Sequence, residues 1–378
     1  MTSSSANSAA VTGGAGATGT ASSGAPVGTD VTPAPAARRV IRPSTVIAAL
    51  AVLLVLAILV SLSVGRFAVP VTDTARILLG SFLPVDQTWT DQQGTVVLDV
   101  RLPRVLLGAL VGAGLALSGA AMQAVFRNPL ASAQVLGVSS GASLGGVLMI
   151  LAGLGGAYLV GGAFVGGLVA LVLVLLIARV TPGSPLLMVI LAGTVIGAMF
   201  NAFVSILTYV ADPNGELPSI VFWLMGSLAT ASYSKLVLAA FPIVIAGAVI
   251  LALRWRVNLL SMGDEDARAL GADPARTRMV LLIAVALITA GAVAVTGVIG
   301  WVGLVVPHLV RMLIGVDNRF VLPASALLGA SYLVLIDTLS RTLTTAEIPI
   351  GILTAIIGAP FFVGLLIKNG KRMWGGND

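Results

Sequence analysis

Ten long apolar runs, separated by short polar stretches, constrain the fold of this chain more than any other feature of its sequence. A membrane-spanning helix needs about 20 mostly apolar residues. The runs leave only 10% of the residues charged and give a mean hydropathy of +1.05, whereas a soluble domain carries roughly 25% charged residues. We therefore predict an all-α polytopic membrane protein with spans at 46–64, 105–126, 135–153, 157–178, 186–210, 236–253, 279–299, 304–314, 322–340 and 350–367.

The positions of the cations predict how this protein sits in the membrane. Cytoplasmic loops of membrane proteins carry an excess of Lys and Arg. With a cytoplasmic N-terminus and ten crossings, 15 of the 21 lysines and arginines fall on the cytoplasmic side. Both termini are then cytoplasmic. The net charge of +6 does not predict nucleic-acid binding, because the basic residues sit at the ends of the apolar runs rather than in one patch.

Composition divides the chain into three parts and excludes several chemistries. Residues 1–45 begin with a long Ala/Gly/Ser-rich stretch that cannot bury a core, so we expect a disordered cytoplasmic tail. The permease domain follows at 46–370, and 371–378 is a short cytoplasmic tail. The chain has no cysteine and a single histidine, His308, which excludes thiolate chemistry and makes a metal site unexpected. No phosphate-binding loop is present, so energy for transport would come from another subunit.

The longest polar stretch between late spans runs from Ser261 to Arg278. Ser261 and Asp264 fit a capping box, Gly271 suits a left-handed helix end, and Asp273 with Pro274 begins a second short helix. We therefore expect two short cytoplasmic helices joined by a glycine turn, within 263–278. A docking element for a partner is favoured over an ordinary solvated loop.

The fifth span carries a polar stripe on one helical face, because its polar and small residues recur at helical spacing. Such a face in a bilayer must meet other helices or water. It is therefore either a wall of a translocation pathway or a set of interhelical hydrogen bonds. The stripe consists of Thr194, Gly197, Asn201, Ser205 and Thr208.

Three arginines lie on the predicted outer side, against the usual charge bias. Arg101 and Arg104 stand at the start of the second span, and Arg341 lies at the outer end of the ninth. They either dock an acidic partner or contact lipid headgroups. Asp337 precedes Arg341 by four residues and is expected to pair with it along the helix.

Glycines four residues apart recur in several spans and let helix backbones approach closely in lipid. We favour tight packing within one subunit over a dedicated dimer face. The pairs are Gly108 and Gly112, Gly141 and Gly145, Gly162 and Gly166, and Gly193 and Gly197.

Four segments resemble the permeases of iron-siderophore and cobalamin ABC importers, the FecCD type. They are 101–131, which begins Arg-Leu-Pro-Arg, 135–142, 297–308 with Gly-Trp-Val-Gly-Leu-Val-Val-Pro-His, and 347–362, which begins Glu-Ile-Pro-Ile-Gly. The likeness is collinear and covers about 46–370, but it leaves out the N-terminal tail. It implies the type II ABC importer permease fold, in which two permease subunits pair around a central path.

The same resemblance implies partners and roles for particular residues. Two cytoplasmic ATPase subunits would bind ATP and Mg and seat the coupling residues Gly263, Asp264, Glu265, Asp266, Ala267, Arg268, Leu270 and Gly271. An extracytoplasmic binding protein would dock on Arg101, Arg104 and Arg341. The fifth and tenth spans would line the path, which adds Thr354 of the tenth span to the predicted path residues. The permease itself would need no cofactor and no catalytic residue.

The expected function is import of a metal chelate across a bacterial cytoplasmic membrane by alternating access. Iron(III)-siderophore is the first expectation, with haem and cobalamin as alternatives. An ion-coupled secondary transporter is the rival class, but the apolar runs lack the chain of buried Asp, Glu or His that a proton relay uses.

Overall fold

The computed structural model describes residues 42–373 except 82, 85 and 181–184. The expected tail therefore lies almost wholly outside the described residues, as do 374–378. All regular structure in the described part is helical. The elements are α1 (Pro43–Ser63), α2 (Val71–Gly80), α3 (Asp91–Thr95), η1 (Val96–Arg101), α4 (Leu102–Val125), η2 (Ala133–Leu136), α5 (Val138–Leu151), α6 (Gly156–Val180), α7 (Pro185–Val210), α8 (Glu216–Leu224), α9 (Tyr233–Ala252), α10 (Arg254–Leu260), α11 (Asp264–Ala269), α12 (Pro274–Thr296), α13 (Val302–Ile314), α14 (Asn318–Thr342) and α15 (Ile350–Met373).

The ten expected spans all correspond to helices of this structure. Seven helical segments in the described part are long and apolar enough to cross a membrane, and three shorter apolar helices complete the set. The shorter ones are α5, α13 and the described apolar part of α15, Ile350–Gly364. The all-α, multi-span architecture predicted from the apolar runs is therefore confirmed.

Three expected boundaries were wrong, each for a local backbone reason. The second span begins earlier, because α3, the π-helix η1 and α4 form one continuous helical segment from Asp91 to Val125. The third begins later, because Gly137 adopts a left-handed conformation (φ 69°) that separates η2 from α5. The seventh ends at Thr296, where Gly297 has a φ of 70° that the helix cannot continue through.

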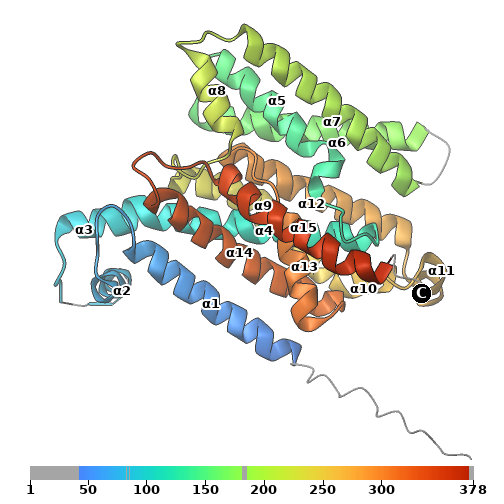
Figure 1. The fold of residues 1–378 in the computed structure, drawn as a ribbon, viewed down its shortest axis with the longest axis horizontal. Coiled ribbons are helices and arrows are strands. Elements are labelled where there is room, and N and C mark those ends of the chain that lie inside the picture. Colours follow the sequence, from blue (N-terminus) through green and yellow to red (C-terminus); the bar gives the residue numbers. More distant parts are fainter. Residues whose placement is uncertain (1–41, 82, 85, 181–184, 374–378) are drawn as a thin grey trace, which may run out of the picture. The chain divides into compact units, whose positions relative to one another are not determined.

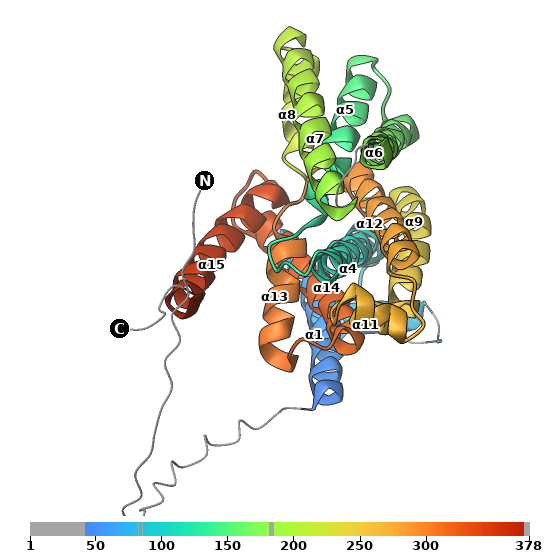
Figure 2. The same ribbon diagram turned by 90° about the vertical axis from the view of Figure 1, so that its right-hand side faces the viewer.

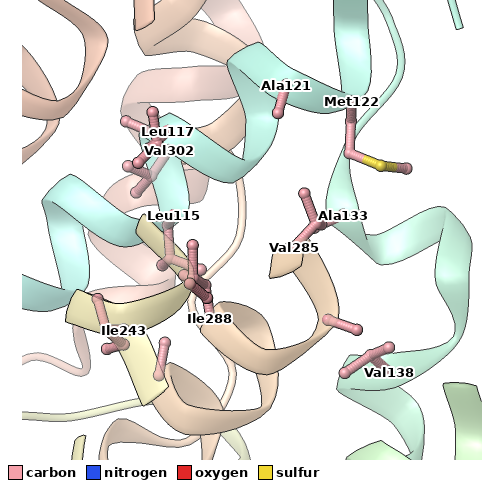
Figure 3. Packing of buried hydrophobic residues seen from close by; sticks show 14 of the residues in the cluster. Leu115, Leu117, Ala121, Met122, Ala133, Val138, Ile243, Val285, Ile288 and Val302 are labelled. Carbon is pink, nitrogen blue, oxygen red and sulfur yellow. The ribbon is translucent and has the colours of Figure 1, made fainter. Parts of the chain in front are cut away.

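The centre of the bundle is α4, which packs against α9, α12, α13 and α14. Its buried side chains include Leu115, Leu117 and Met122, and the same hydrophobic core contains Ile243 of α9 and Ile288 of α12 (Figure 3). α1 lies along α14, whereas α5, α6, α7 and α8 form a group of neighbouring helices that packs on α12 through α5 and α6 (Figure 1). The turned view shows α15 beside α13, inclined away from α4 (Figure 2).

Small residues set the closest helix contacts, and these contacts lie within one subunit as expected. A Cβ atom added to Gly145 of α5 would collide with the carbonyl oxygen of Gly162 in α6, and one added to Gly141 would collide with that of Gly166. Gly112 of α4 meets Gly329 of α14 in the same way. Backbones approach this closely only where side chains are absent.

The backbone between α12 and α13 is not helical, although it lies between two buried helices. Residues 297–301 have no regular structure, and Trp301 has a φ of 68°, which is unfavourable for a residue with a side chain. Non-helical backbone at membrane depth is tolerated where it is buried in protein or lines a water-filled cavity. Val298 and Trp301 line two neighbouring cavities, which is consistent with this rule.

Candidate functional site

An ion-pair cluster joins the predicted outer ends of α4 and α14 to the loop before α15. The Nε and Nη2 atoms of Arg104 donate to the carboxylate of Asp337 at 2.8–3.0 Å. Both terminal nitrogens of Arg104 also donate to Glu347, at 3.1 and 2.9 Å. The side chain of Asp337 is only 1% exposed, and that of Glu347 is 28% exposed. One arginine therefore binds two carboxylates through charge-assisted hydrogen bonds, which are stronger than hydrogen bonds between neutral groups.

The other two arginines on the predicted outer side, Arg101 and Arg341, are buried and hydrogen bonded. Arg101 is 5% exposed and donates to the carbonyl oxygens of Leu62 and Ser63 at 2.7 and 3.0 Å. Arg341 is 8% exposed and donates to the carbonyl of Ser61. Its Nε lies 3.7 Å from Asp337 Oδ2, so the expected pairing along α14 is confirmed as a long contact.

This cluster gives the outer arginines a role that their sequence positions did not reveal. Their donors tie α1, α4 and α14 together inside the chain. The cross-helix pair of Arg104 with Asp337 joins residues 233 positions apart, so no local spacing could have predicted it. Binding-protein docking by Arg101, Arg104 and Arg341 stays a prediction.

A polar groove of about 570 Å³ runs along the predicted stripe of α7. Thr194, Gly197 and Asn201 line it, and the side chains of Thr194 and Asn201 are exposed. Ser205 and Thr208 lie farther along α7, outside the groove, and their hydroxyls donate to the carbonyls of Asn201 and Val204. The hydroxyl of Thr194 likewise donates within α7, to the carbonyl of Ile190 at 2.9 Å, so the stripe forms part of the groove wall while its hydroxyls bond within their own helix.

Most of the groove wall opposite α7 comes from residues that sequence reasoning missed. Ser132 and Gln134 precede Gly137, and Ser139, Ser140 and Ser143 lie on the first turns of α5. Single serines in a glycine-rich stretch give no periodic signal. Thr354 is fully buried in α15, and its hydroxyl donates to the carbonyl of Gly351, so it does not line this groove.

The predicted coupling element begins with α11, which is one short helix as expected. Gly271 has the left-handed φ of 78° expected at its end, and Asp273 caps the next helix through the backbone N–H of Arg276 at 3.1 Å. The expected second short helix was wrong, because Pro274 begins the long helix α12. The glycine turn is thus joined directly to a membrane-spanning helix.

The expected capping box of Ser261 and Asp264 was also wrong. The residue before α11 is Gly263, which has no side chain to cap the helix, and Ser261 instead accepts a hydrogen bond from Asn318 at 2.9 Å. Asp264 pairs with Arg278 and with Arg127, the latter at 2.9 Å. The hydrogen bond from Arg278 holds the pKa of Asp264 below its ordinary value. Two arginines attract this carboxylate more strongly than one backbone N–H does.

The remaining coupling residues divide into inward and outward sets. Ala267 is fully buried against the bundle, and Gly263 is partly buried. The outward set is exposed and presents two carboxylates, one guanidinium and one leucine to the surroundings. This set consists of Glu265, Asp266, Arg268, Leu270 and Gly271.

Comparison with known proteins identifies the family of this chain. A sequence profile of the FecCD transport family matches residues 53–368. The chain belongs to the FecCD transport family. It is 43% identical to the molybdate import system permease protein MolB of Haemophilus influenzae over 323 residues, which cover 85% of this chain and 95% of that one. It is 39% identical to the hemin transport system permease protein HmuU of Yersinia pestis, over 89% and 99% of the two chains.

A solved structure places this FecCD family member among ABC transporters. A metal-chelate type ABC transporter in an inward-facing conformation matches with a TM-score of 0.77 and 42% identity, over 86% of this chain and 99% of that one. FecCD proteins are multi-span permease subunits, which are transport components rather than enzymes. They work in a membrane with ATPase and substrate-binding partners, and the ATP and Mg belong to the ATPases.

Proposed function

We propose that this chain forms one wall of the translocation path of an ABC importer for iron(III)-siderophore. The observation that carries the proposal is the groove of α5 and α7. Its wall offers hydroxyl and amide groups, and the groove lining contains no charged residue among the described residues. A neutral polar wall suits a bulky hydrophilic solute, because it hydrogen bonds to the solute without holding it by charge.

A second permease subunit would close this groove. The exposed side chains of α7 include large apolar residues such as Val195 and Phe203, which need lipid or protein around them. Two ATPases would bind the exposed face of α11 on the cytoplasmic side. A binding protein would deliver the chelate at the opposite end, where Arg101, Arg104 and Arg341 lie, and both termini would be cytoplasmic.

The transport step follows from how α11 is mounted. Asp264 is tied to Arg127 after α4 and to Arg278 at the start of α12. Motion of an ATPase bound to α11 would therefore pass into two helices that pack against each other in the core. Those helices carry α5 and the groove with them, which produces alternating access.

The chelate is tested by uptake into liposomes that contain the purified permease, its ATPase and its binding protein. Iron(III)-siderophore, haem, cobalamin and molybdate are offered in parallel, with ATP inside. We expect ATP-dependent uptake of iron(III)-siderophore above the other three. Molybdate is the second candidate, because the MolB relative shares 43% of its residues with this chain. Uptake driven by a proton or sodium gradient without ATP would contradict the ABC class.

The role of α11 is tested by charge reversal on its exposed side only. The double variant Glu265→Lys with Asp266→Lys leaves the ion pairs of Asp264 with Arg127 and Arg278 in place. Asp264→Lys is not used, because it would break these pairs. We expect the exposed double variant to insert normally but to lose ATP-driven uptake and tight ATPase binding. The control Asp212→Lys, an exposed residue outside the coupling element, should transport normally. Unchanged uptake in the double variant would exclude this face as the ATPase contact.

A further inference from the structure

A cleft of about 420 Å³ lies between α6 and α9, and we call it the α6–α9 cleft. Both helices pack extensively against α12, which forms the floor of the cleft while α6 and α9 form its walls. Every described residue that lines it is apolar. A water molecule in such a cavity would find no hydrogen-bond partners, so apolar cavities do not hold ordered water. The α6–α9 cleft therefore suits an apolar occupant.

Small residues make room for this occupant. A Cβ added to Gly161 of α6 would meet no atom within 4 Å, so there is open space beside the α6 backbone where it lines the cleft. At Gly291 of α12, by contrast, an added Cβ would lie 2.8 Å from the ring of Pro242 in α9. The cleft is thus closed at its floor, where α9 and α12 touch, and open beside α6.

The α6–α9 cleft opens on a surface that is suited to lipid. The helices α6, α9 and α12 are each long and apolar enough to cross a membrane. Phe241 of α9 lines the cleft and is 73% exposed, and Leu238 and Ile245 beside it are also exposed. Transfer of such apolar surface from water to an apolar environment is favourable. The cleft therefore opens toward the acyl chains of the bilayer or toward an apolar protein partner.

The size of the cleft favours an acyl chain over a helix of a protein partner. Three turns of helix are about 10 Å across and about 16 Å long, so they occupy roughly 1,200 Å³. The cleft holds about 420 Å³, which is far too little for a helix. An acyl chain is narrow and flexible, so it can enter between α6 and α9 without moving them apart.

A lysine stands at the predicted outer end of the cleft. Lys235 precedes Leu238 by three residues, so it lies about one turn away on the same face of α9. Its Nζ donates to the hydroxyl of Thr230 at 2.6 Å, and no carboxylate pairs with it among the described residues. An ammonium has three donors, so two remain for another acceptor. Tyr158 and Tyr233 are exposed at the starts of α6 and α9, as is typical at the level of lipid headgroups.

We propose that the α6–α9 cleft binds one acyl chain of an anionic phospholipid, phosphatidylglycerol, and that Lys235 binds the phosphate of its headgroup. The chain fills the space between α6 and α9, and the ammonium of Lys235 holds the headgroup at the end of the cleft. The site shares no lining residue with the polar groove of α5 and α7. It goes beyond the proposed function, because it does not depend on which solute the protein carries.

Native mass spectrometry of the full chain tests this site, because it counts the lipids that stay bound when the detergent is removed. Phosphatidylglycerol and phosphatidylcholine with identical acyl chains are offered at equal concentrations. We expect the wild type to retain one phosphatidylglycerol with about fivefold preference, because one lysine near an anionic headgroup contributes an attraction of that size. Phosphatidylglycerol should also raise the midpoint of thermal unfolding, since it binds the folded protein.

Separate variants test the two ends of the lipid. Lys235→Gln should lose the preference for phosphatidylglycerol while its retention of phosphatidylcholine stays unchanged. Gly161→Leu and Ala157→Leu fill the cleft and should each lower the retention of both lipids. Arg76→Gln, which removes an exposed cation outside the cleft lining, is the control for Lys235→Gln. Gly364→Leu is the control for Gly161→Leu, because Gly364 is also exposed and its Cβ would also meet no atom within 4 Å. Both controls should behave as the wild type.

Three results would overturn the lipid site. One is wild-type retention of phosphatidylglycerol by both cleft-filling variants. Another is a wild type that retains neither lipid and gains no thermal stability from either. The third is a dimer of this chain that dissociates in Gly161→Leu, which would show that a second copy covers the cleft. A preference for phosphatidylglycerol that survives Lys235→Gln would overturn the headgroup contact.

Discussion

At the scale of single residues, the pair of Arg104 with Asp337 has the largest expected energetic effect. Removing one partner of a buried ion pair costs about 3–5 kcal/mol, because the other charge stays buried without compensation. We therefore predict that Asp337→Asn lowers the midpoint of thermal unfolding markedly in detergent, as measured by intrinsic fluorescence. Asp273→Asn is the control, since its pair with Arg276 is exposed and asparagine also caps helices. Equal midpoints for both variants would contradict this account of the cluster.

Asp264 gives a prediction about pH. Its pKa is lowered in the folded protein by the hydrogen bond from Arg278. The unfolded pKa of Asp is about 3.9. A carboxylate whose pKa is lower than this in the folded protein stabilises the structure at pH values above the unfolded pKa, and this stabilisation is lost as the pH falls through the folded pKa. Hydrogen-exchange protection of α11 should thus be steady near neutral pH and should fall only in strong acid. Asp264→Asn should have low protection throughout. Protection lost already between neutral pH and pH 5 would count against the tether.

The contacts of a residue could be predicted from the sequence only where its partner lies close to it in the chain. The pairing of Asp337 with Arg341, the cap at Asp273 and the turn at Gly271 each depend on neighbours in the chain, and all three were predicted correctly. The pairs of Asp337 with Arg104 and of Asp264 with Arg127 join distant segments. No sequence spacing predicts these two pairs. The capping box of Ser261 with Asp264 was the best partner that the local sequence offered for Asp264, and it was wrong.

At the scale of elements, the contact between α5 and α6 depends on glycine. Replacing glycine by alanine in a helix normally stabilises it by about 1 kcal/mol. At Gly145 we predict the opposite, because the added Cβ would collide with the carbonyl of Gly162. Gly145→Ala should lower the unfolding midpoint, whereas Gly161→Ala, where a Cβ would meet no atom within 4 Å, should leave it unchanged or raise it. A Gly145→Ala midpoint at or above the wild-type value would exclude this packing.

The membrane-spanning elements were predictable because hydropathy over a long run identifies a span without any knowledge of its partners. Their interruptions were not. Gly137 and Gly297 end or delay helices through positive φ angles, and glycine is too frequent here, with 44 in the chain, for one position to stand out. The serines of the groove were missed for a different reason, because their proximity to α7 comes from tertiary packing.

At the scale of the whole molecule, the account places two functional surfaces on opposite sides of a membrane. We propose that the exposed side of α11 faces the cytoplasm and an ATPase, and that the arginine cluster and the loop 343–349 face outward to a delivering partner. The charge bias of the sequence predicts this orientation. The described helices supply the spans, and membership of the FecCD family supplies the transport class.

Site-directed labelling of the naturally cysteine-free chain tests this arrangement most directly. Single variants Glu265→Cys and Thr345→Cys are exposed to a membrane-impermeant maleimide in intact cells and in inverted membrane vesicles. The account predicts that Thr345→Cys reacts only in intact cells and that Glu265→Cys reacts only in inverted vesicles. Reaction of both cysteines from the same side, or with the two sides exchanged, would contradict it.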